Sequence, residues 1–289
     1  MSLTARTKQL LQKHNLKPVH HRGQNFLIQN KILDKIINVA KLKKNDIVLE
    51  VGPGLGFLTE KLIKKTKKVV AVELDRNLVT ILSEEFKDIK NLEIKEGNIL
   101  KFSADDLGLR DKKYKIVANL PYNITSRFMR NFLEEAEKPD EMILMIQREV
   151  ANRIVAGPGK MSMLSLSCQF YADCKVEFLV GKRNFLPAPK VDSAVIKLKI
   201  KKDLLCHSGL DPESKPLKYS QGSIDDKKLF KIAKIGFSSK RKKLIGNLSK
   251  GLKINKDELK KIFKKIGISG DVRSQELGVN DWIRLCENI

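Results

Sequence analysis

The sequence predicts an α/β fold in which helices cover a parallel sheet, followed by a small helical domain. From residue 30 to about 150, short β-branched apolar runs alternate with helical stretches of about 10 to 15 residues, which is the pattern of repeated βαβ units. After residue 200 the apolar residues recur with helical spacing instead. We therefore expect a first domain over residues 1–200 and a helical second domain over residues 201–289.

Seven short apolar runs are the candidate strands of the first domain. They are Ile47–Val51, Val69–Glu73, Leu92–Lys95, Lys115–Ala118 and Met142–Ile146, followed by Val176–Val180 and Ser193–Ile200 near the far edge of the sheet. The expected helices are Phe57–Lys65, Arg76–Lys87, Ile124–Ala136, Gln147–Val155 and Leu164–Tyr171. Short apolar runs separated by helices imply a parallel sheet with helices on both faces.

Two amphipathic patterns define the second domain. One helix face is formed by Leu229, Ile232, Ala233, Gly236 and Phe237, and a second by Leu259, Ile262, Phe263 and Ile266. Between the domains, residues 206–223 contain Ser, Gly, Pro, Asp and Lys without periodicity. This segment is predicted to be an exposed, flexible insertion.

The charge balance points to a polyanionic partner. The 289 residues include 57 Lys and Arg against 34 Asp and Glu, a net charge of +23. Such an excess favours nucleic acid first and an anionic membrane surface second. A lysine-rich composition throughout the chain contributes to this excess, but it does not explain why residues 1–23 contain five basic residues and no acidic one. We expect this arm to be solvated or to face phosphates.

Several classes of protein are disfavoured by what the sequence lacks. No run of about 18 apolar residues is present, so no membrane span is expected, and the N-terminus has no apolar stretch typical of a secretory signal. The four cysteines show neither C-x-x-C nor other metal-ligand spacing, and the histidines of the N-terminal arm have no acids near them. We expect a cytoplasmic protein with reduced thiols and no metal.

A glycine-rich segment, Glu50–Gly56, follows a predicted strand and opens a helix. Gly52 and Gly54 allow a tight turn and a close backbone approach to a ligand, and Glu73 ends the next strand, where a carboxylate can bind both ribose hydroxyls of an adenosine. Nicotinamide dehydrogenases and S-adenosylmethionine methyltransferases share this geometry. The G-x-G-x-G spacing and Glu50 favour methyl transfer, because a carboxylate attracts a sulfonium and an ammonium but repels a pyrophosphate. A structural turn without a ligand is the remaining alternative.

The tetrapeptide Asn119-Leu120-Pro121-Tyr122 follows the fourth predicted strand. An adenine amine is a poor nucleophile because its lone pair is conjugated with the ring. The Asn119 side chain and the Leu120 or Pro121 carbonyl can accept its two N–H groups, which favours a tetrahedral nitrogen aimed at a methyl donor. Tyr122 can stack on an extruded base. On its own, the tetrapeptide also fits an ordinary βα turn.

This tetrapeptide is similar to the signature of N6-adenine methyltransferases. Four further segments resemble the ribosomal RNA adenine dimethyltransferases: Gly23–Leu27, Gln147–Ala151, Phe185–Ser193 and Gly236–Leu244. The resemblance runs from about Gly23 to the C-terminus with one gap. It is strongest to the bacterial enzymes that dimethylate two adjacent adenines near the 3′ end of the small-subunit (16S) RNA. It implies a Rossmann-like S-adenosylmethionine-dependent methyltransferase sheet with a small C-terminal helical domain.

The same resemblance implies roles for individual residues. Phe185 would sandwich the target base opposite Tyr122, although from the residues alone Phe185 is a core aromatic. Asn98 stands where the family usually has an aspartate, so we expect weaker cofactor binding without loss of activity. The residues expected to hold S-adenosylmethionine are Asn25, Leu27, Gly52, Gly54, Glu73, Asn98 and Asn119.

The RNA-binding surface is expected on the second domain. Lys240, Arg241, Lys242 and Lys243 are predicted to lie on the exposed side of the helix that buries Leu229, where they would contact phosphates. A solvated lysine face is the alternative for any one of them. Sequence choice would come from RNA shape and the extruded base, because the major groove of duplex RNA is too narrow to read. The expected partner of the monomeric protein is small-subunit ribosomal RNA in a pre-30S particle.

Three other functions fit parts of the sequence. A macrolide-resistance methylase of large-subunit RNA shares the motifs, but the C-terminal helix and the Phe185–Ser193 segment favour the small-subunit enzyme. A non-catalytic RNA-binding assembly factor would predict a degraded Asn119 loop, and that loop is intact. A nicotinamide dehydrogenase would bind its cofactor without transferring a methyl group.

Overall fold

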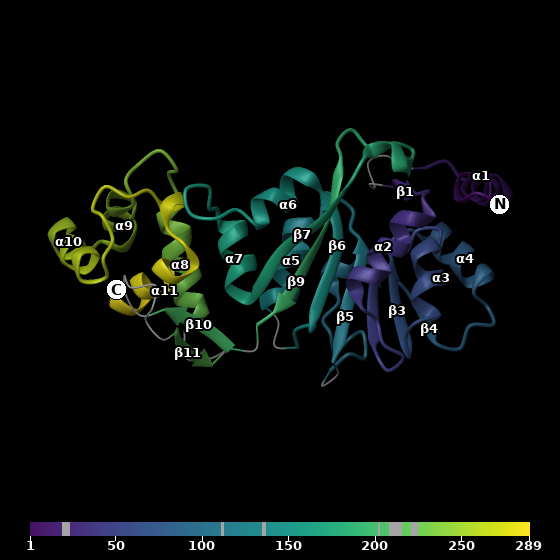
Figure 1. Ribbon diagram of the computed structural model, residues 1–289, viewed down its shortest axis with the longest axis horizontal. Coiled ribbons are helices and arrows are strands. Elements are labelled where there is room, and N and C mark those ends of the chain that lie inside the picture. The colour runs from purple at the N-terminus through teal and green to yellow at the C-terminus, as the bar shows by residue number, and fades with distance from the viewer. Residues whose placement is uncertain (19–23, 111–112, 135–136, 202, 208–215, 221–224) are drawn as a thin grey trace. The chain divides into compact units, whose positions relative to one another are not determined.

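The chain divides into two compact units in the computed structural model (Figure 1). The structure describes residues 1–18, 24–110, 113–134, 137–201, 203–207, 216–220 and 225–289. The first unit combines Met1–Ala151 with Cys174–Ile200, and the second combines Asn152–Asp173 with Lys201–Ile289. The segment Asn152–Asp173, placed in the first domain by the sequence, therefore belongs with the C-terminal helices. Its helix α7 (Met163–Tyr171) contacts α8 (Asp226–Gly236), with the Tyr171 hydroxyl 2.7 Å from Asp226.

The first unit is built on a seven-stranded sheet with the order β4-β3-β2-β5-β6-β9-β7. Its strands are β2 (Ile47–Val51), β3 (Lys68–Glu73), β4 (Leu92–Glu96), β5 (Tyr114–Asn119), β6 (Glu141–Gln147), β7 (Ala172–Val180) and β9 (Ser193–Ile200). β2 pairs in parallel with β3 and β5, and β3–β4 and β5–β6 are also parallel. The candidate strands of the sequence are thus all present.

One strand differs from the expected parallel arrangement. β9 runs antiparallel to β6, with Gln147 opposite Ser193. The chain enters β9 from β7 through the short helix η3 (Lys182–Asn184) and the two-residue strand β8 (Phe185–Leu186), without a crossover helix. A parallel strand would need a long crossover connection. The short connection from β7 instead lets the chain reverse its direction as it enters β9.

Helices cover the sheet because its strands are apolar on both faces. Val48, Leu49 and Val70 are fully buried, which explains why these strands show continuous apolar runs instead of alternation. The helices of the unit are α2 (Asn30–Ala40), α3 (Phe57–Ile63), α4 (Arg76–Glu85), α5 (Thr125–Glu134) and the start of α6 (Arg148–Ile154). These helices follow the strands in alternation and place the loops at the carboxyl ends of the strands together.

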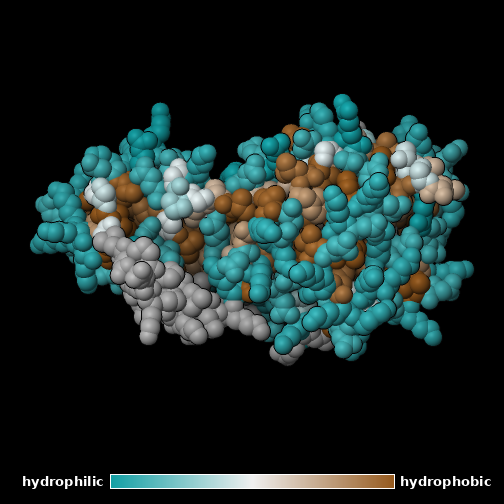
Figure 2. Space-filling model, viewed as in Figure 1, coloured by the Kyte–Doolittle hydropathy of each residue, from teal (hydrophilic) through white to brown (hydrophobic). Residues whose placement is uncertain are grey.

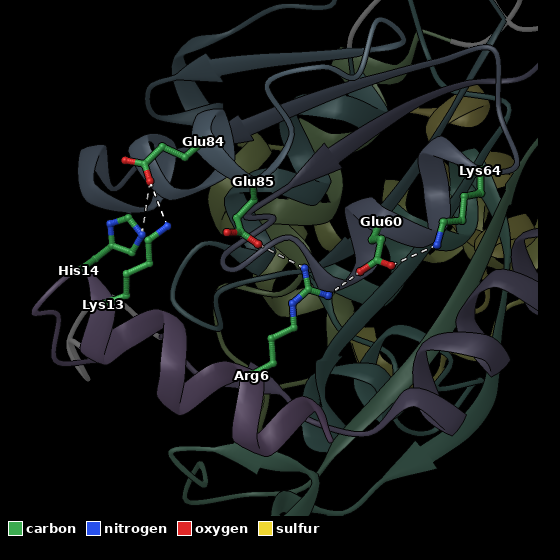
Figure 3. Close-up of polar contacts among 7 residues, drawn as sticks. All are labelled: Arg6, Lys13, His14, Glu60, Lys64, Glu84 and Glu85. Atoms are coloured by element: carbon green, nitrogen blue, oxygen red, sulfur yellow. Dashed lines mark hydrogen bonds and ion pairs between the residues drawn. The ribbon is translucent and has the colours of Figure 1, made fainter. Parts of the chain in front are cut away.

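The N-terminal arm contains a docked helix, α1 (Leu3–Lys13), instead of the expected solvated segment. Its buried face includes Leu3 and Leu10. Arg6 Nη1 lies 2.7 Å from Glu60 of α3, and Arg6 Nη2 lies 3.4 Å from Glu85 of α4. Figure 3 shows Arg6 between these two carboxylates, while Lys13 and His14 converge on Glu84. The prediction failed because acids far away in sequence pair with Arg6 and Lys13 of the arm; residues 19–23 lie outside the described part.

Ion pairing lowers the pKa of Glu60, the partner of Arg6 on α3. The hydrogen bond from Arg6 holds the pKa of the Glu60 carboxyl below its usual value, and Lys64, which lies 3.1 Å away, acts in the same direction. Helix α1 is therefore attached to α3 and α4, the two helices whose N-termini follow β2 and β3.

The second unit is mainly helical. After α7, its elements are β10 (Asp203–His207), β11 (Pro216–Ser220), α8 (Asp226–Gly236), α9 (Leu244–Leu252), α10 (Lys256–Lys265), η4 (Ser274–Glu276) and α11 (Val279–Asn288). Leu229, Ile232 and Ala233 on α8 and Leu259 and Phe263 on α10 are buried, as the spacing predicted. Trp282 of α11 is fully buried and stacks on the Phe237 ring at 5.3 Å between centroids.

Part of the predicted insertion 206–223 is ordered. β10 and β11 form an antiparallel pair with His207 opposite Pro216, so residues 206–207 and 216–220 are strand and not loop. Sequence periodicity missed this pair because two five-residue strands are too short for a clear pattern. Residues 208–215 and 221–223 lie outside the described residues, and their predicted flexibility stays a prediction.

Hydrophilic side chains dominate the face of the protein shown in Figure 2. This agrees with the large number of lysines in the chain. Among the helices that the structure describes, none combines the length and the apolar character needed to cross a bilayer.

Candidate active site

A pocket of about 400 Å³ opens at the carboxyl ends of β2, β3 and β5 in the first unit. A cavity of this size accepts a cofactor-sized molecule, and this edge of an α/β sheet is the usual place for one. Of the predicted site residues, those that line it are Asn25, Leu27, Gly52, Gly54, Glu73, Asn98, Asn119 and Pro121. Leu120, Tyr122 and Phe185 do not line it.

The glycine turn, residues 52–56, passes close to its neighbours in a conformation that suits glycine. Gly52 and Gly54 have φ angles of +64° and +61°, in the left-handed region that other residues rarely adopt. A Cβ added to Gly54 would lie 3.3 Å from the Phe26 ring, and one on Gly52 would lie 3.7 Å from Pro121. The turn therefore brings bare backbone to the pocket, between the N-terminal segment and the loop after β5.

Glu73, at the end of β3, is held as an acceptor beside the glycine turn. Its Oε2 accepts the Gly54 N–H at 3.1 Å, and its Oε1 accepts the N–H groups of Leu74 at 2.8 Å and Asp75 at 3.0 Å. Burial raises the pKa of this carboxyl, and the three backbone hydrogen bonds oppose that rise. The donors fix the position of a carboxylate at the bottom of the pocket.

Glu50 is an acidic residue in an apolar setting. It is 1% exposed, and its Oε2 has no hydrogen-bond partner among the described residues. Burial raises its pKa to about 8; the Thr59 hydroxyl lowers this pKa and the Glu73 carboxylate raises it further. An unpartnered carboxyl oxygen in the wall of a pocket fits a cationic group, such as the ammonium or sulfonium of S-adenosylmethionine.

The segment before α2 crosses the pocket. Phe26–Leu27 forms strand β1, which pairs with β8 so that Leu27 lies opposite Phe185. The Gln24 side chain donates to Asp75 at 2.9 Å, and the Asn119 amide donates to the Asn25 carbonyl at 3.4 Å. These contacts connect the segment to the end of β3 and to the end of β5.

The predicted catalytic loop, Asn119–Tyr122, follows β5 and is held by hydrogen bonds. The Leu120 N–H donates to the Met145 carbonyl at 3.1 Å, and the Pro121 carbonyl accepts the Ile124 N–H at 3.2 Å. The Tyr122 hydroxyl lies 2.8 Å from the Ser193 hydroxyl, and burial raises the pKa of Tyr122. The loop is thus connected to β6, to β9 and to Ile124, the residue before α5.

Two residues with predicted roles are less available than the sequence suggested. Phe185 is 3% exposed and belongs to the hydrophobic core, so it would have to be uncovered before it could touch a base. The Asn98 oxygen accepts the Leu100 N–H at 3.0 Å and caps the short helix η2 (Ile99–Lys101), which leaves one lone pair for a ligand.

The basic run Lys240–Lys243 lies in the second unit, in the turn between α8 and α9, and not on a helix as predicted. Helix α8 ends at Gly236, whose carbonyl accepts hydrogen bonds from the Asn247 amide and the Ser274 hydroxyl. A Cβ at Gly236 would lie 2.5 Å from Trp282, so the close packing of α11 fixes this point. The four side chains are exposed, and Lys243 pairs with an aspartate of its own unit.

Sequence reasoning missed several residues of the pocket. Leu74 lines it with 59% of its surface exposed, directly after Glu73. Asp75 also lines it while its side chain caps α4. Arg127 on α5 reaches it as well. The signals available in the sequence for Leu74 and Asp75 were an apolar residue and a helix N-cap acid directly after the strand-ending Glu73. In the described part of the chain, His, Cys, Asp and Glu form no cluster of three or more that could hold a metal.

The strand order with one antiparallel strand, the glycine turn after β2 and the acid ending β3 define the class of Rossmann-like S-adenosylmethionine-dependent methyltransferases. The family model described as ribosomal RNA adenine dimethylase matches residues 16–211. The chain belongs to the ribosomal RNA adenine dimethylase family, and the fold class and family predicted from the sequence are confirmed.

Individual relatives extend the similarity over nearly the whole chain. The ribosomal RNA small subunit methyltransferase A of Dehalococcoides mccartyi (strain CBDB1) is 39% identical over 285 residues, which cover 99% of this chain and 93% of the relative. The protein of the same name from Clostridium acetobutylicum is 35% identical, with 98% of each chain covered.

Solved structures agree with this family. A dimethyladenosine transferase from Plasmodium falciparum has a TM-score of 0.73 and 26% identity, covering 89% of this chain and 94% of its own. The 23S rRNA methyltransferase ErmE has a TM-score of 0.69 and 23% identity, covering 91% of this chain and 99% of its own, which shows a shared fold.

Proposed function

We propose that this protein transfers methyl groups from S-adenosylmethionine to N6 of two adjacent adenines near the 3′ end of 16S ribosomal RNA. The observation that carries the proposal is the catalytic loop at the edge of the pocket, in a chain similar over nearly its full length to small-subunit methyltransferases. The protein would act in the cytoplasm as a monomer on a pre-30S particle and contribute to subunit biogenesis.

The pocket residues fit S-adenosylmethionine, which would supply an electrophilic methyl group on a sulfonium. The glycine turn would lie against its methionine end, with Asn25 and Leu27 covering that end. Glu50 would face its positive charge, and the buried Glu50 oxygen without a partner supports this assignment. Glu73 would accept the ribose hydroxyls, and Asn98 would offer its remaining lone pair to the adenine amine of the cofactor.

The catalytic loop would hold the target amine. The Asn119 amide nitrogen donates to the Asn25 carbonyl, which leaves Oδ1 to accept one N–H of the adenine. The Pro121 carbonyl already accepts the Ile124 N–H, so the Leu120 carbonyl is the better second acceptor. With both N–H groups held by these acceptors, the lone pair of the target nitrogen would be directed at the methyl group that S-adenosylmethionine supplies.

Base stacking completes the proposed site. Tyr122 would stack on the extruded adenine, with its hydroxyl held by Ser193 so that the ring keeps its orientation. Phe185 would form the opposite face only after β1 and β8 move, since it is buried behind Leu27. The exposed turn Lys240–Lys243 would contact RNA phosphates.

Transfer of tritiated methyl from S-adenosylmethionine to small subunits that lack adenine methylation tests the proposal. The wild type should label these subunits as N6-dimethyladenosine, and large subunits should stay unlabelled. Asn119→Ala should lose activity by about 100-fold or more, the effect of removing one transition-state hydrogen bond, while Asn255→Ala in the second unit should keep it. Label on large subunits would instead support a function like that of ErmE, and no label on either would contradict the enzyme assignment.

A further inference from the structure

A group of cations lies beside the catalytic loop in the first unit. This group consists of Arg148, Lys182, Arg183 and Lys190. It is called the Asp192 cluster here because Asp192 accepts hydrogen bonds from two of its members. All four side chains are exposed, and within the described residues none of them forms an ion pair. By contrast, several other cations of this unit, such as Arg6 and Lys61, are neutralised by carboxylates at 2.7 Å.

Hydrogen bonds to Asp192 fix the backbone of two members of this cluster, Arg148 and Lys182, relative to the catalytic loop. The Asp192 carbonyl accepts the Arg148 N–H at 3.0 Å, and Asp192 Oδ1 accepts the Lys182 N–H at 2.9 Å. The next residue, Ser193, lies 2.8 Å from the Tyr122 hydroxyl. Asp192 and Ser193 thus bring the backbone of Arg148 and Lys182 close to the Tyr122 hydroxyl, so the cationic side chains start from a fixed place beside the catalytic loop.

The surface at this place also exposes apolar side chains. Leu179, near the end of β7, is 54% exposed, and Val191 is 45% exposed. Large apolar residues that are this exposed are few in the described chain, and another of them, Leu74, lines the pocket. A surface that joins cations with apolar side chains suits a nucleic acid strand, which presents phosphates together with the flat faces of its sugars and bases.

The local charge favours an anion. The carboxylates that accompany the four cations are Asp192 and the exposed Glu149. Asp192 already accepts the Lys182 N–H with one oxygen, and its charge adds to the rise that burial causes in the pKa of the Tyr122 hydroxyl. Four positive charges against two negative ones leave an excess that a row of phosphates would neutralise.

We propose that the Asp192 cluster binds the backbone phosphates of the RNA strand that carries the target adenine. The identity of the polyanion as RNA rests on the proposed function. The site would give the catalytic unit its own contacts to the RNA, besides those of the Lys240–Lys243 turn. It would hold the strand beside Tyr122 while the base is extruded, so its contribution is to substrate binding and not to the chemical step.

The test compares two variants with equal loss of charge. One is the double variant Lys182→Ala/Arg183→Ala. The other is Lys87→Ala/Lys90→Ala, whose exposed lysines lie just before β4, at the opposite edge of the sheet from β7. Binding of each full-length protein to a labelled single-stranded RNA of the 16S 3′ region is measured by fluorescence anisotropy without cofactor, at 50 and 200 mM salt.

Each phosphate contact to a single strand adds about 0.7 to the slope of log affinity against log salt concentration, so the loss of two contacts lowers the slope by about 1.4. Over the fourfold change in salt, the wild type should therefore lose about sevenfold more affinity than Lys182→Ala/Arg183→Ala. Lys87→Ala/Lys90→Ala should match the wild type, and S-adenosylmethionine binding should be equal in all three. A salt slope for Lys182→Ala/Arg183→Ala equal to that of the wild type would overturn the inference while the proposed function stands. If the wild type binds RNA with the expected difference but transfers no methyl group, the inference stands and the proposed function fails.

Discussion

Replacing Glu50 with glutamine should stabilise the protein without cofactor, and the gain should grow with pH. The pKa of this buried carboxyl is about 8 in the folded chain, against an ordinary value of 4.5. Because the folded value is raised, the protonated form is the one that folding favours. The stability of the wild type is therefore complete below about pH 4.5 and decreases as the pH rises towards 8.

The size of the effect follows from the shift. One pKa unit corresponds to about 1.4 kcal/mol, so the difference between the two values gives ~5 kcal/mol above pH 8 and ~3 kcal/mol at pH 7. Glutamine keeps the shape of the side chain and cannot ionise, so it removes this pH-dependent loss. The Thr59 hydroxyl remains beside the new amide.

Urea unfolding of both proteins at pH 5, 7 and 8.5 measures the difference. Far-ultraviolet circular dichroism is the suitable signal, because the one tryptophan of the chain, Trp282, lies in the second unit. Asp88→Asn, which removes an exposed carboxylate of the first unit, is the control and should show no such trend. A constant difference between Glu50→Gln and the wild type at all three pH values would refute the reasoning.

Three further predictions test other parts of the site. Gly54→Ala should weaken S-adenosylmethionine binding at least tenfold and cost about 1–2 kcal/mol of stability, because φ is +61° and the new Cβ meets Phe26; calorimetric titration giving wild-type affinity would disprove this. Asn98→Asp should tighten cofactor binding, since a carboxylate keeps the cap and is the stronger acceptor; unchanged or weaker binding in the same titration counts against it. Arg6→Ala should lower stability by about 1 kcal/mol or less, as the pair with Glu60 is partly exposed, and high salt should reduce the difference in melting temperature. A larger, salt-independent loss would mean that packing of α1, and not charge, holds it.

Local patterns in the sequence predicted much of the fold and the pocket. Strand and helix positions follow from short-range periodicity, so the elements from β2 to β6 were found with small errors at their ends. The glycine turn and the loop after β5 were also recognisable, because each depends on neighbouring residues: positive φ angles at Gly52 and Gly54, and a proline after Leu120. Their meeting in one pocket follows from the parallel sheet, which brings the carboxyl ends of its strands to one edge.

Contacts between distant segments were beyond the sequence. Docking of α1 depends on the carboxylates of Glu60 and Glu85, more than 50 residues away, and the end of α8 depends on packing against Trp282. The burial of Phe185 agrees with its interpretation as a core aromatic from the residues alone, but its position opposite Leu27 comes from a contact between distant segments. The antiparallel direction of β9 likewise follows from the path of the chain and not from its composition.

The sequence by itself determined that a carboxylate would stand before the glycine turn and another at the end of β3. Only the tertiary structure decided their pKa shifts and their hydrogen-bond partners, because desolvation depends on everything packed around a group. Burial raises the pKa of both carboxyls, but Glu73 meets three backbone donors that oppose this rise, whereas Glu50 has an oxygen with no partner in the described chain and a pKa of about 8. Two glutamates of one pocket are thus given different properties by the fold that surrounds them.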